Sequence, residues 1–530
     1  MPLERPPTRI SPLAFWMEAS AVLLFVNKAI LRLGDTFVGH DQSWYLVAAQ
    51  RLLSGTELYG PQLRETNPPL IVWFSTLPVL LARCLHIGPV VAFYSIILAT
   101  IFACMCWCIR IAHLYSARIS SAFPGLLACA IVYAEFRTDV PDFGQREQLV
   151  VTLMLPYVLA AASGMANRLR LGERCALGVV AALAVCFKPH YALVVVGLEL
   201  FLALYTRSLR RAHSPELLSV AGSGILYVIL VHLLTPRYAR EIVPLLIDTY
   251  WAYGTKSALA LAYGQRWITL FTVAAVLVCI TFRKVLYDPA TAIALLVCSL
   301  AASLAYEIQH TDWTYHEYPH RTFFLLAVFY IGIDILCHLI NKLQANRLLT
   351  MRFAAGLVAL QAGLIAIHLY RLFPVQTDVS NPSLDRFFAT EVPRSTVLVL
   401  STSVGTISSV FQRNLNWGSG SPGLWLLPAV IQNQRGPTGP PVPFKRLPPD
   451  TVTRLADLQR SQAAEDLNHW QPSTVLVQQC TVAHPCQAIE GKDVDLLAWL
   501  LESRRFADAW SHYQRKPGAP PFFDLYARIH

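Results

Sequence analysis

Long apolar segments separated by short polar loops make up most of the first 370 residues. A helix needs about 20 apolar residues, at 1.5 Å each, to cross a bilayer. Stretches of that kind begin near Leu13, Pro89, Ala122, Leu149, Pro215, Trp267, Pro289, Thr322 and Met351. A further segment, 175–205, is too long for one helix and contains a proline, which removes a helical hydrogen bond and clashes with the preceding turn. We interpret it as two short helices broken at 187–190, which predicts about eleven transmembrane helices.

The apolar run 70–82 decides the topology of the chain. If it crossed the membrane, the loop with Arg110 and Arg118 would lie outside. If it lies along the outer interface instead, the later basic loops all fall on the cytoplasmic side, as the positive-inside rule requires. We therefore predict an interfacial helix at 70–82 and a cytoplasmic N-terminus. The outer face would then carry the polar loops 34–67, 135–148, 236–265 and 307–321 and everything after about residue 373.

After about residue 373 the sequence becomes polar and rich in proline and glycine. Short runs of β-branched residues at 396–400 and 474–477 predict strands, and the periodic segments 451–470 and 494–503 predict helices. The stretch 419–443 has the composition of a loop. We therefore expect two domains: a membrane domain over 1–372, and a small soluble α/β domain over 373–530, close to the usual domain size.

Composition excludes an ordinary soluble protein, because 55% of the residues are hydrophobic and only 14% are charged. The net charge of +10 comes mostly from short loops between apolar segments, so it reports orientation, and we expect no nucleic-acid partner. Most of the twelve cysteines lie in apolar segments without metal-binding spacing. Cys480 and Cys486 lie in a polar segment, and we expect a disulfide there if that segment is outside the cytoplasm.

A polar and aromatic island, GHDQSWYLVAAQRLLSGTELYGPQLRETNPPL, follows the first apolar segment at 39–70. It contains an acidic residue, Asp41, then an amphipathic helix pattern, and then Glu65, Asn67 and two prolines. This order resembles the first outer loop of the GT-C membrane glycosyltransferases, such as the protein O-mannosyltransferases and the lipid A aminoarabinose transferases. In that superfamily an H/K-P-P-type turn closes the loop. Here Asn67 stands where the family has a charged residue, and Glu65 lies close by.

The resemblance implies that Asp41 is the catalytic base, since sugar transfer to a hydroxyl or amine needs a carboxylate near the acceptor proton. The alternative is that Asp41 is a helix N-cap. The second outer loop supplies Asp142 and Glu147 as candidate catalytic carboxylates facing Asp41. Arg146 would clamp the phosphate of a lipid-linked sugar, because a guanidinium binds that anion with two donors. The alternative for this loop is a solvated turn with internal salt bridges.

Other candidate substrate-binding residues are Glu65 in the first loop and Lys188 and His190 at the predicted helix break. An ionisable group at membrane depth needs a partner or a water-filled cavity, and a phosphate would provide that partner. A lysine near a helix end can also extend its ammonium to the interface. Both interpretations of Lys188 stay open.

The segment 309–321 is rich in histidine, tyrosine and carboxylates. It is similar to the K-G-W-x-Y-H-x-x-P segment found before a late span in several bacterial GT-C proteins. Trp313, Tyr315, His316 and Pro319 match, whereas the basic residue and glycine that open the segment are replaced. We assign Tyr315 and His316 to substrate binding. Aromatic side chains also anchor helices at a membrane interface, and this alternative suits Trp313 better than His316.

Arg321 ends this segment, and we assign it to substrate binding as a further ligand of the phosphate. His316 and His320 are four residues apart, a spacing that suits a metal on one helical face, but the intervening proline interrupts that face. We therefore assign no metal ligand and no required cofactor, and a divalent metal stays open.

Together these features predict a mainly α polytopic membrane protein of GT-C type in the cell membrane, the inner membrane of a bacterium, with a periplasmic or extracellular C-terminal domain. The resemblance implies a hexosyl- or pentosyltransferase that moves a sugar from a polyprenyl-phosphate donor to a lipid, glycan or protein acceptor. The alternative is a transporter or flippase of lipid-linked glycans. Transporter folds usually show internal repeats with functional groups at the bilayer midplane, whereas here we see no repeat, and the polar groups gather on the outer loops.

Overall fold

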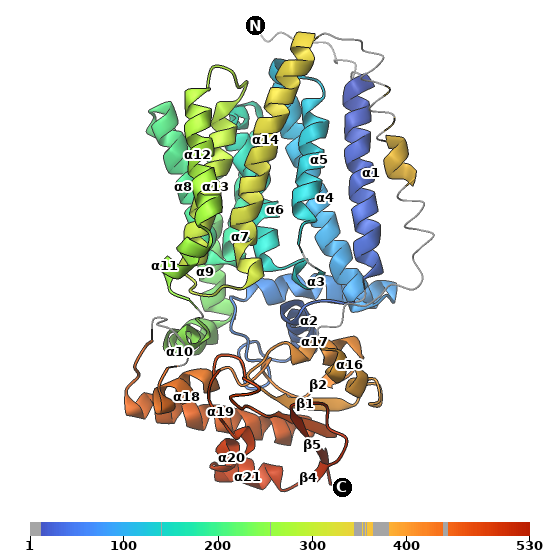
Figure 1. Cartoon of the computed structure of the whole chain (residues 1–530), viewed down its shortest axis with the longest axis vertical. Helices are drawn as coiled ribbons and strands as arrows, with labels where there is room; N and C mark the ends of the chain where they lie inside the picture. Colours follow the sequence, from blue (N-terminus) through green and yellow to red (C-terminus); the bar gives the residue numbers. More distant parts are fainter. Residues whose placement is uncertain are drawn as a thin grey trace.

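The computed structural model describes residues 12–343, 352, 356, 358–363 and 381–529, apart from residues 36, 139, 255 and 438–443. Its larger part is a helical bundle, and a smaller domain with a sheet covers one end of that bundle (Figure 1). The bundle is formed by α1 (Pro12–Gly34), α4 (Pro89–Ile119), α5 (Phe123–Glu135), α6 (Arg146–Ala162), α7 (Leu171–Phe187), α8 (Ala192–Thr206), α9 (Pro215–Leu234), α12 (Arg266–Thr281), α13 (Pro289–Glu307) and α14 (Tyr318–Leu343).

Six helical segments of the described chain are long and apolar enough to cross a membrane. The number is seven if α11 (Ala258–Gly264) and α12, bent by 68° at a short break, form one span. The segments predicted to begin near Ala122, Leu149 and Cys175 form the shorter bundle helices α5, α6 and α7, of 13, 17 and 17 residues. The span predicted from Met351 lies largely outside the described residues. The protein is thus a mainly helical multi-pass membrane protein.

The predicted helix break is confirmed. α7 ends at Phe187, Lys188 adopts an extended backbone, and the single turn η3 (Pro189–Tyr191) leads into α8. Because the proline cannot continue the helical hydrogen-bond ladder, the chain turns here, and Lys188 pairs with Glu147 at the start of α6.

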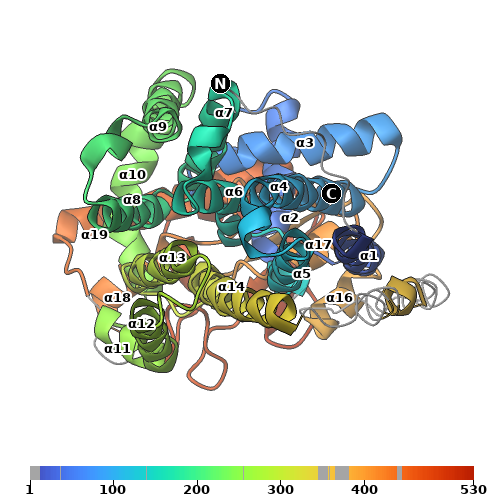
Figure 2. The ribbon, with the colours of Figure 1, turned by 90° about the horizontal axis from the view of Figure 1, so that it is seen from above.

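The apolar run at 70–82 forms α3 (Leu70–Leu85), which lies across the end of the bundle next to α2 (His40–Leu53) (Figures 1 and 2). Ile71, Val72 and Val79 are buried against the rest of the protein, whereas Leu77 and Leu80 are exposed. An amphipathic helix in this orientation suits the membrane interface, as the parity of the basic loops predicts.

The C-terminal domain contains a five-stranded sheet in the order β2-β1-β3-β5-β4. β2, β1 and β3 are parallel, and β5 runs antiparallel to both β3 and β4. The strands are β1 (Thr396–Leu400), β2 (Asn416–Trp417), β3 (Thr474–Gln478), β4 (Tyr513–Lys516) and β5 (Phe523–Arg528). Its helices are α16 (Pro382–Phe388), α17 (Thr406–Gln412), α18 (Leu427–Arg435), α19 (Pro449–Trp470), α20 (Leu496–Leu501) and α21 (Arg504–Trp510).

Both predicted strands of this domain are confirmed as β1 and β3, and the two predicted helices correspond to α19 and α20. The disulfide between Cys480 and Cys486 is also present. The prediction of a loop over 419–443 is wrong in part, because α18 lies within it. Proline at its first turn is compatible with a helix start, and burial of Val430 and Ile431 stabilises it.

The two faces of the sheet have different partners, since alternate strand residues point to opposite sides. Leu398, Leu400 and Val475 belong to the core of the C-terminal domain. Val397 and Val399 belong to the same apolar cluster as the bundle. On this side α17 packs against α2. The connection between α9 and α11, with η5 (Tyr238–Ile242), α10 (Val243–Thr249) and η6 (Tyr250–Tyr253), also reaches the domain.

We predict the sidedness of the bundle from the basic loops. Reporter proteins fused after Ser120, after Asp142 and after Thr390 should read cytoplasmic for the first and external for the other two. α5 separates Ser120 from Asp142, and Thr390 belongs to the C-terminal domain, which lies at the end of the bundle where the second loop lies. Paired cytoplasmic and periplasmic reporters in intact cells measure this. The opposite pattern would contradict an interfacial α3.

Candidate active site

Helix α2 brings the first outer loop against the second. It starts after Gly39, and its side chain Gln42 is wholly buried and donates from Nε2 to the carbonyl oxygens of Pro141, at 2.9 Å, and Phe143, at 3.2 Å. A Cβ on Gly39 would collide with the Pro141 oxygen. This close contact fixes the second loop beside the first turn of α2.

Asp41 lies in that first turn, where an acidic side chain interacts favourably with the helix dipole. It is not the N-cap residue: Gly39 is, and no side chain caps this end. The N-cap interpretation is therefore wrong. Asp41 Oδ1 is 3.4 Å from His40 Nε2, and Asp41 Oδ2 is buried without a hydrogen-bond partner.

The centre of the site is a buried ion pair between Glu147, in the first turn of α6, and Lys188, at the break between α7 and α8. Glu147 is wholly buried, and its Oε1 is also 3.4 Å from His316 Nε2. His316 lies in η7 (Thr314–Glu317) and is held by Thr311 Oγ1, 2.6 Å from its Nδ1. Tyr191 donates its hydroxyl to the His316 carbonyl oxygen at 3.2 Å.

Arg146 connects this pair to the first outer loop. Its guanidinium lies over the ring of Tyr45 at 5.8 Å and donates to Asn67 Oδ1. The charges of Asp41 and Glu147 both act on Arg146, so the three groups are neighbours. Arg146 Nε is buried and has no hydrogen-bond partner.

Glu65 orients the residue that Arg146 binds. Its Oε1 accepts the backbone N–H groups of Thr66 and Asn67, both at 2.7 Å, and the Asn67 side-chain amide at 2.8 Å. Its Oε2 accepts the Trp44 indole N–H at 2.6 Å. Burial raises the pKa of Glu65, against the lowering by the hydrogen bonds from Asn67. Glu65 therefore acts on Arg146 through Asn67, which bonds both of them.

Four buried polar atoms around this centre have no hydrogen-bond partner among the residues that the structure describes: Asp41 Oδ2, Arg146 Nε, Glu147 Oε2 and His190 Nε2. Buried polar atoms are almost always hydrogen-bonded, because an unsatisfied one costs about 1–3 kcal/mol. Several such atoms in one region, both donors and acceptors, indicate a site that a polar ligand completes.

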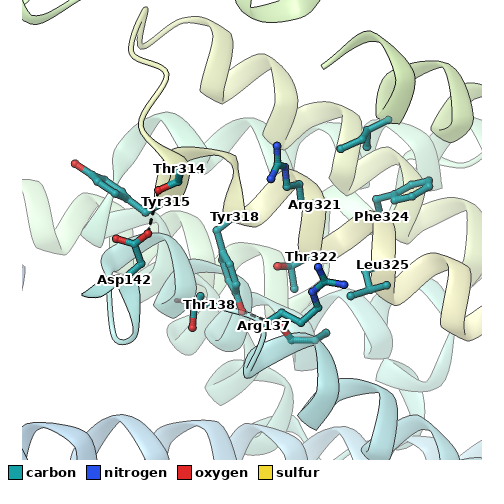
Figure 3. Close-up of a pocket in the computed structure, with 12 residues that line it drawn as sticks. Arg137, Thr138, Asp142, Thr314, Tyr315, Tyr318, Arg321, Thr322, Phe324 and Leu325 are labelled. Atoms are coloured by element: carbon teal, nitrogen blue, oxygen red, sulfur yellow. Dashed lines mark hydrogen bonds between the residues drawn. The ribbon is translucent and has the colours of Figure 1, made fainter. Parts of the chain in front are cut away.

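A pocket of about 450 Å³ opens beside this centre between the second loop, α12 and α14 (Figure 3). Ligand pockets commonly have 300–1,000 Å³. Ile268, Phe324 and Leu325 form its apolar side. The polar side is lined by Arg137, Thr138, Asp142, Thr314, Tyr315, Tyr318, Arg321 and Thr322.

Tyr315 connects the pocket to the buried centre, because it lines the pocket and the charges of Asp41 and Glu147 act on its hydroxyl. Thr314 donates to Asp142 Oδ2 at 3.1 Å across the pocket. Arg321 is more than half exposed and pairs with Glu317.

The structure thus brings Asp41, Arg146, Glu147, Lys188, Tyr315 and His316 together, with His190 next to them. Asp142 and Arg321 line the pocket instead, and Glu65 stands behind Asn67. Sequence reasoning missed Gln42, Tyr45 and Asn67. The unusual Asn before two prolines was a signal for Asn67, whereas an aromatic or amide on an amphipathic helix is too common to be one.

Among the described residues, no group of three or more His, Cys, Asp or Glu side chains is placed to hold a metal ion. His320 is buried and bonds Ser299 Oγ through Nδ1 at 3.0 Å, so it does not converge with His316. The described residues therefore supply no set of ligands for the divalent metal that the sequence left as an open question.

Fold and site together define a mainly helical multi-pass membrane protein with a polar centre at the end of the bundle that the C-terminal domain covers. The chain is similar to ArnT from Cupriavidus metallidurans in the apo state, with a TM-score of 0.53, 14% identity and coverage of 97% of both chains. It is equally similar to ArnT bound to undecaprenyl phosphate, with a TM-score of 0.52, 13% identity and 97% coverage of both.

The mycobacterial arabinofuranosyltransferase AftD aligns with a TM-score of 0.42 and 15% identity, over 97% of this chain and 40% of that one. No family model and no curated protein matches the sequence. At these identities the likeness to ArnT establishes the fold.

We predict that Lys188→Met lowers the free energy of unfolding by about 3–5 kcal/mol, because it leaves the Glu147 carboxylate buried without its cation. Lys188→Met combined with Glu147→Gln should recover most of that loss. Unfolding in detergent micelles, followed by tryptophan fluorescence, measures both.

The matched control is Lys445→Met, which removes the half-exposed pair with Asp248 and should cost less than about 1 kcal/mol. Equal losses for Lys188→Met and Lys445→Met would contradict a buried, uncompensated Glu147.

Proposed function

We propose that this protein is a membrane glycosyltransferase that takes a sugar from a polyprenyl-phosphate donor and transfers it to a lipid, glycan or protein acceptor on the outer side of the membrane. The observation that carries this proposal is the set of unsatisfied buried groups around Asp41, Arg146 and Glu147. A carboxylate oxygen of Asp41 and a guanidinium N–H of Arg146, both without partners and on groups whose charges interact, suit an acceptor proton and a donor phosphate. The GT-C fold, and the undecaprenyl phosphate bound to ArnT, are consistent with it.

In this proposal Asp41 is the general base. The acceptor oxygen or nitrogen bonds to the anomeric carbon of the sugar while the bond from that carbon to the phosphate oxygen breaks. Polyprenyl phosphate leaves with the electron pair, and the acceptor proton moves to Asp41. A base placed in this way contributes about 10²–10⁴-fold. Glu147 and Asp142 orient the neighbouring groups.

Arg146 and Lys188 are the proposed ligands of the phosphate. Planar guanidinium donors bind a phosphate with two hydrogen bonds, and Arg146 still has an unused N–H in the structure. Lys188 already neutralises Glu147, so a bound phosphate would share its ammonium and bring a second anion close to it. His316, Tyr315 and His190 surround the same space.

The pocket between the second loop and α14 is the proposed entrance for the donor. Its apolar side is formed by residues of α12 and α14, which suits a polyprenyl chain, and Arg137 and Arg321 on its polar side would attract the phosphate. Tyr315 then lies between the entrance and the buried centre. A lipid-linked donor requires such a lateral opening, because its tail stays in the bilayer.

Asp41→Asn tests the base. The substitution preserves the shape of the side chain and removes its ability to take a proton, so sugar transfer should fall by roughly two to four orders of magnitude. Loss of labelled sugar from a polyprenyl-phosphate donor in membranes is the measurement. Asp35→Asn, in the same connection between α1 and α2, is the matched control and should retain activity.

Retained turnover in Asp41→Asn would remove this residue from the mechanism. If Asp142→Asn and Glu147→Gln were also fully active, the proposed site would have no catalytic carboxylate, and the proposed function would be wrong.

The entrance is tested by Arg137→Gln together with Arg321→Gln. Removing charged donors to a phosphate should raise the donor KM by roughly tenfold, with kcat little changed, since neither residue lies in the buried centre. Initial rates over a range of donor concentrations give both constants. Arg240→Gln, an exposed arginine of the third outer loop, is the control and should leave KM unchanged. An unchanged KM in the double variant would place the entrance elsewhere.

A further inference from the structure

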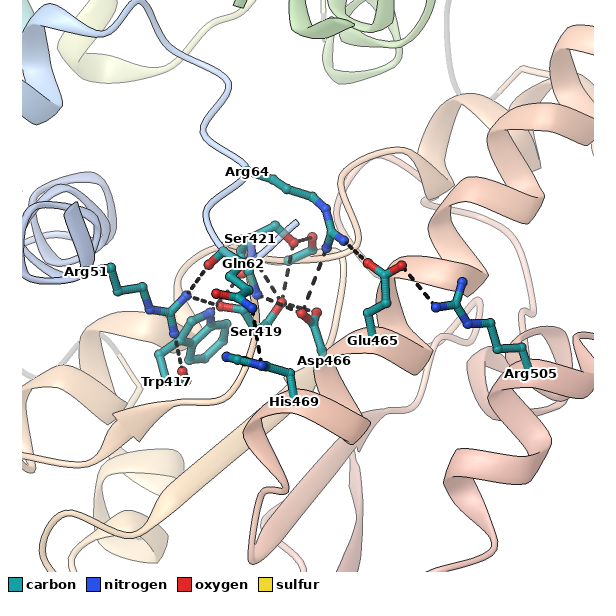
Figure 4. Close-up of polar contacts among 12 residues, drawn as sticks. Arg51, Gln62, Arg64, Trp417, Ser419, Ser421, Glu465, Asp466, His469 and Arg505 are labelled. Carbon is teal, nitrogen blue, oxygen red and sulfur yellow. Dashed lines mark hydrogen bonds and ion pairs between the residues drawn. The ribbon is translucent and has the colours of Figure 1, made fainter. Parts of the chain in front are cut away.

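Two arginines of the first loop bind the C-terminal domain (Figure 4). Arg51, at the end of α2, donates to the carbonyl oxygens of Trp417 and Ser419, the latter at 2.5 Å, and lies over the Trp470 ring at 4.0 Å. Arg64 donates to Glu465 Oε2 at 2.6 Å, and its Nη1 is 3.9 Å from Asp466 Oδ1. Both arginines come from the membrane domain, and the partners just named belong to the C-terminal one; Arg51 also donates to the Gln62 carbonyl oxygen of its own loop, at 3.1 Å.

Asp466 organises the part of the C-terminal domain that receives the loop. It is buried, and it accepts hydrogen bonds from Ser419 Oγ at 2.6 Å and from the Gly420 N–H at 2.9 Å. The Gly420 carbonyl in turn accepts the backbone N–H of Arg64 at 2.6 Å. Burial raises the pKa of Asp466 to about 6, against the lowering by Arg64 and by these hydrogen bonds.

The two backbones meet so closely that no side chain fits at Gly420. A Cβ there would lie 2.5 Å from the carbonyl oxygen of Pro61 and 3.2 Å from the backbone of Gln62. Both are main-chain atoms, which cannot move aside as a flexible side chain does. The contact therefore determines the path of the loop just before Arg64.

From Arg64 the chain continues directly to the buried centre. Glu65, the next residue, fixes Asn67 by two hydrogen bonds, because its Oε1 accepts both the backbone N–H and the side-chain amide of Asn67. The same oxygen also accepts the N–H of Thr66. Asn67 Oδ1 accepts from Arg146. Hydrogen bonds thus run from Asp466 through Gly420 to the backbone of Arg64, and from Glu65 through Asn67 to the guanidinium of Arg146; the peptide bond between Arg64 and Glu65 joins the two parts.

We infer that Asp466, Gly420 and Arg64 are positioning residues: by docking on the first outer loop, the C-terminal domain sets Asn67 and thereby aims Arg146 at the donor phosphate. This inference rests on the proposed function, because it assigns Arg146 to that phosphate. A domain that only covered the bundle would need no buried carboxylate and no side-chain-free contact at this place. The contacts of Arg51 with the C-terminal domain hold the last turn of α2, whose first turn carries Asp41.

The test compares Gly420→Ala with Gly405→Ala in the full-length protein. A Cβ at Gly405 meets only Ser403 Oγ, at 3.6 Å, so this variant changes the same domain without touching the loop. Binding of undecaprenyl phosphate to the purified proteins is measured. Gly420→Ala should weaken it by roughly tenfold, the scale of one hydrogen bond to a charged group, and Gly405→Ala should bind like the wild type. Amide exchange of residues 62–67 should be faster in Gly420→Ala alone.

A double-mutant cycle separates positioning from simple docking. Arg64→Gln should weaken undecaprenyl phosphate binding in the wild type and have no further effect in the Arg146→Gln background, because both act through the same guanidinium. A merely structural role would lower the melting temperature and leave the affinity of the folded protein unchanged, or give additive losses. Either result would overturn the inference.

Failure of the proposed function has a different signature. If the wild type does not bind undecaprenyl phosphate at all, the proposed function falls and this inference with it. If the wild type binds and Gly420→Ala binds equally well, only the positioning role is wrong.

Discussion

The buried ion pair between Glu147 and Lys188 is the interaction on which the arrangement of the site depends. Neither charge is stable alone in a bundle of apolar helices, because removing a charge from water costs several kcal/mol. The pair therefore forces the start of α6 and the break between α7 and α8 to the same place. His316, from the connection before α14, packs on the same carboxylate, so three distant segments converge on one charge.

Each loop around that ion pair contributes different groups to the site. The first loop supplies Asp41 and, through Asn67, the orientation of Arg146. The second loop supplies Arg146 and Glu147 themselves and is pinned to α2 by Gln42. The loop 307–321 lines the adjoining pocket with Thr314 and Tyr315. Polar groups thus meet at the end of the bundle, where a substrate with an apolar tail and a charged head has both of its parts in suitable surroundings.

The C-terminal domain completes this arrangement from the other side. One face of its sheet shares an apolar cluster with the bundle, while the other face has a core of its own. Helix α2 lies between the two parts and contacts α17. Charged groups buried in this way are shielded from water, which strengthens the electrostatic interactions among them. The domain is therefore as much a part of the proposed site as the bundle helices are.

Local patterns in the sequence determined the elements of this protein. Apolar segments, the proline at 189, the β-branched runs at 396–400 and 474–477 and the two cysteines of one polar segment each act over a few residues, and each was predicted correctly. Asp41, Arg146 and Glu147 were also candidates from the sequence, Asp41 because the order of its loop resembles that of a known family, and their roles stay a proposal. Only the tertiary structure decided which of these groups meet. The contacts of Gln42 with Pro141, of Asn67 with Arg146 and of Arg64 with Gly420 join segments about 80 to 360 positions apart. They depend on helix packing and on close backbone approach, and neither leaves a local periodicity in the sequence.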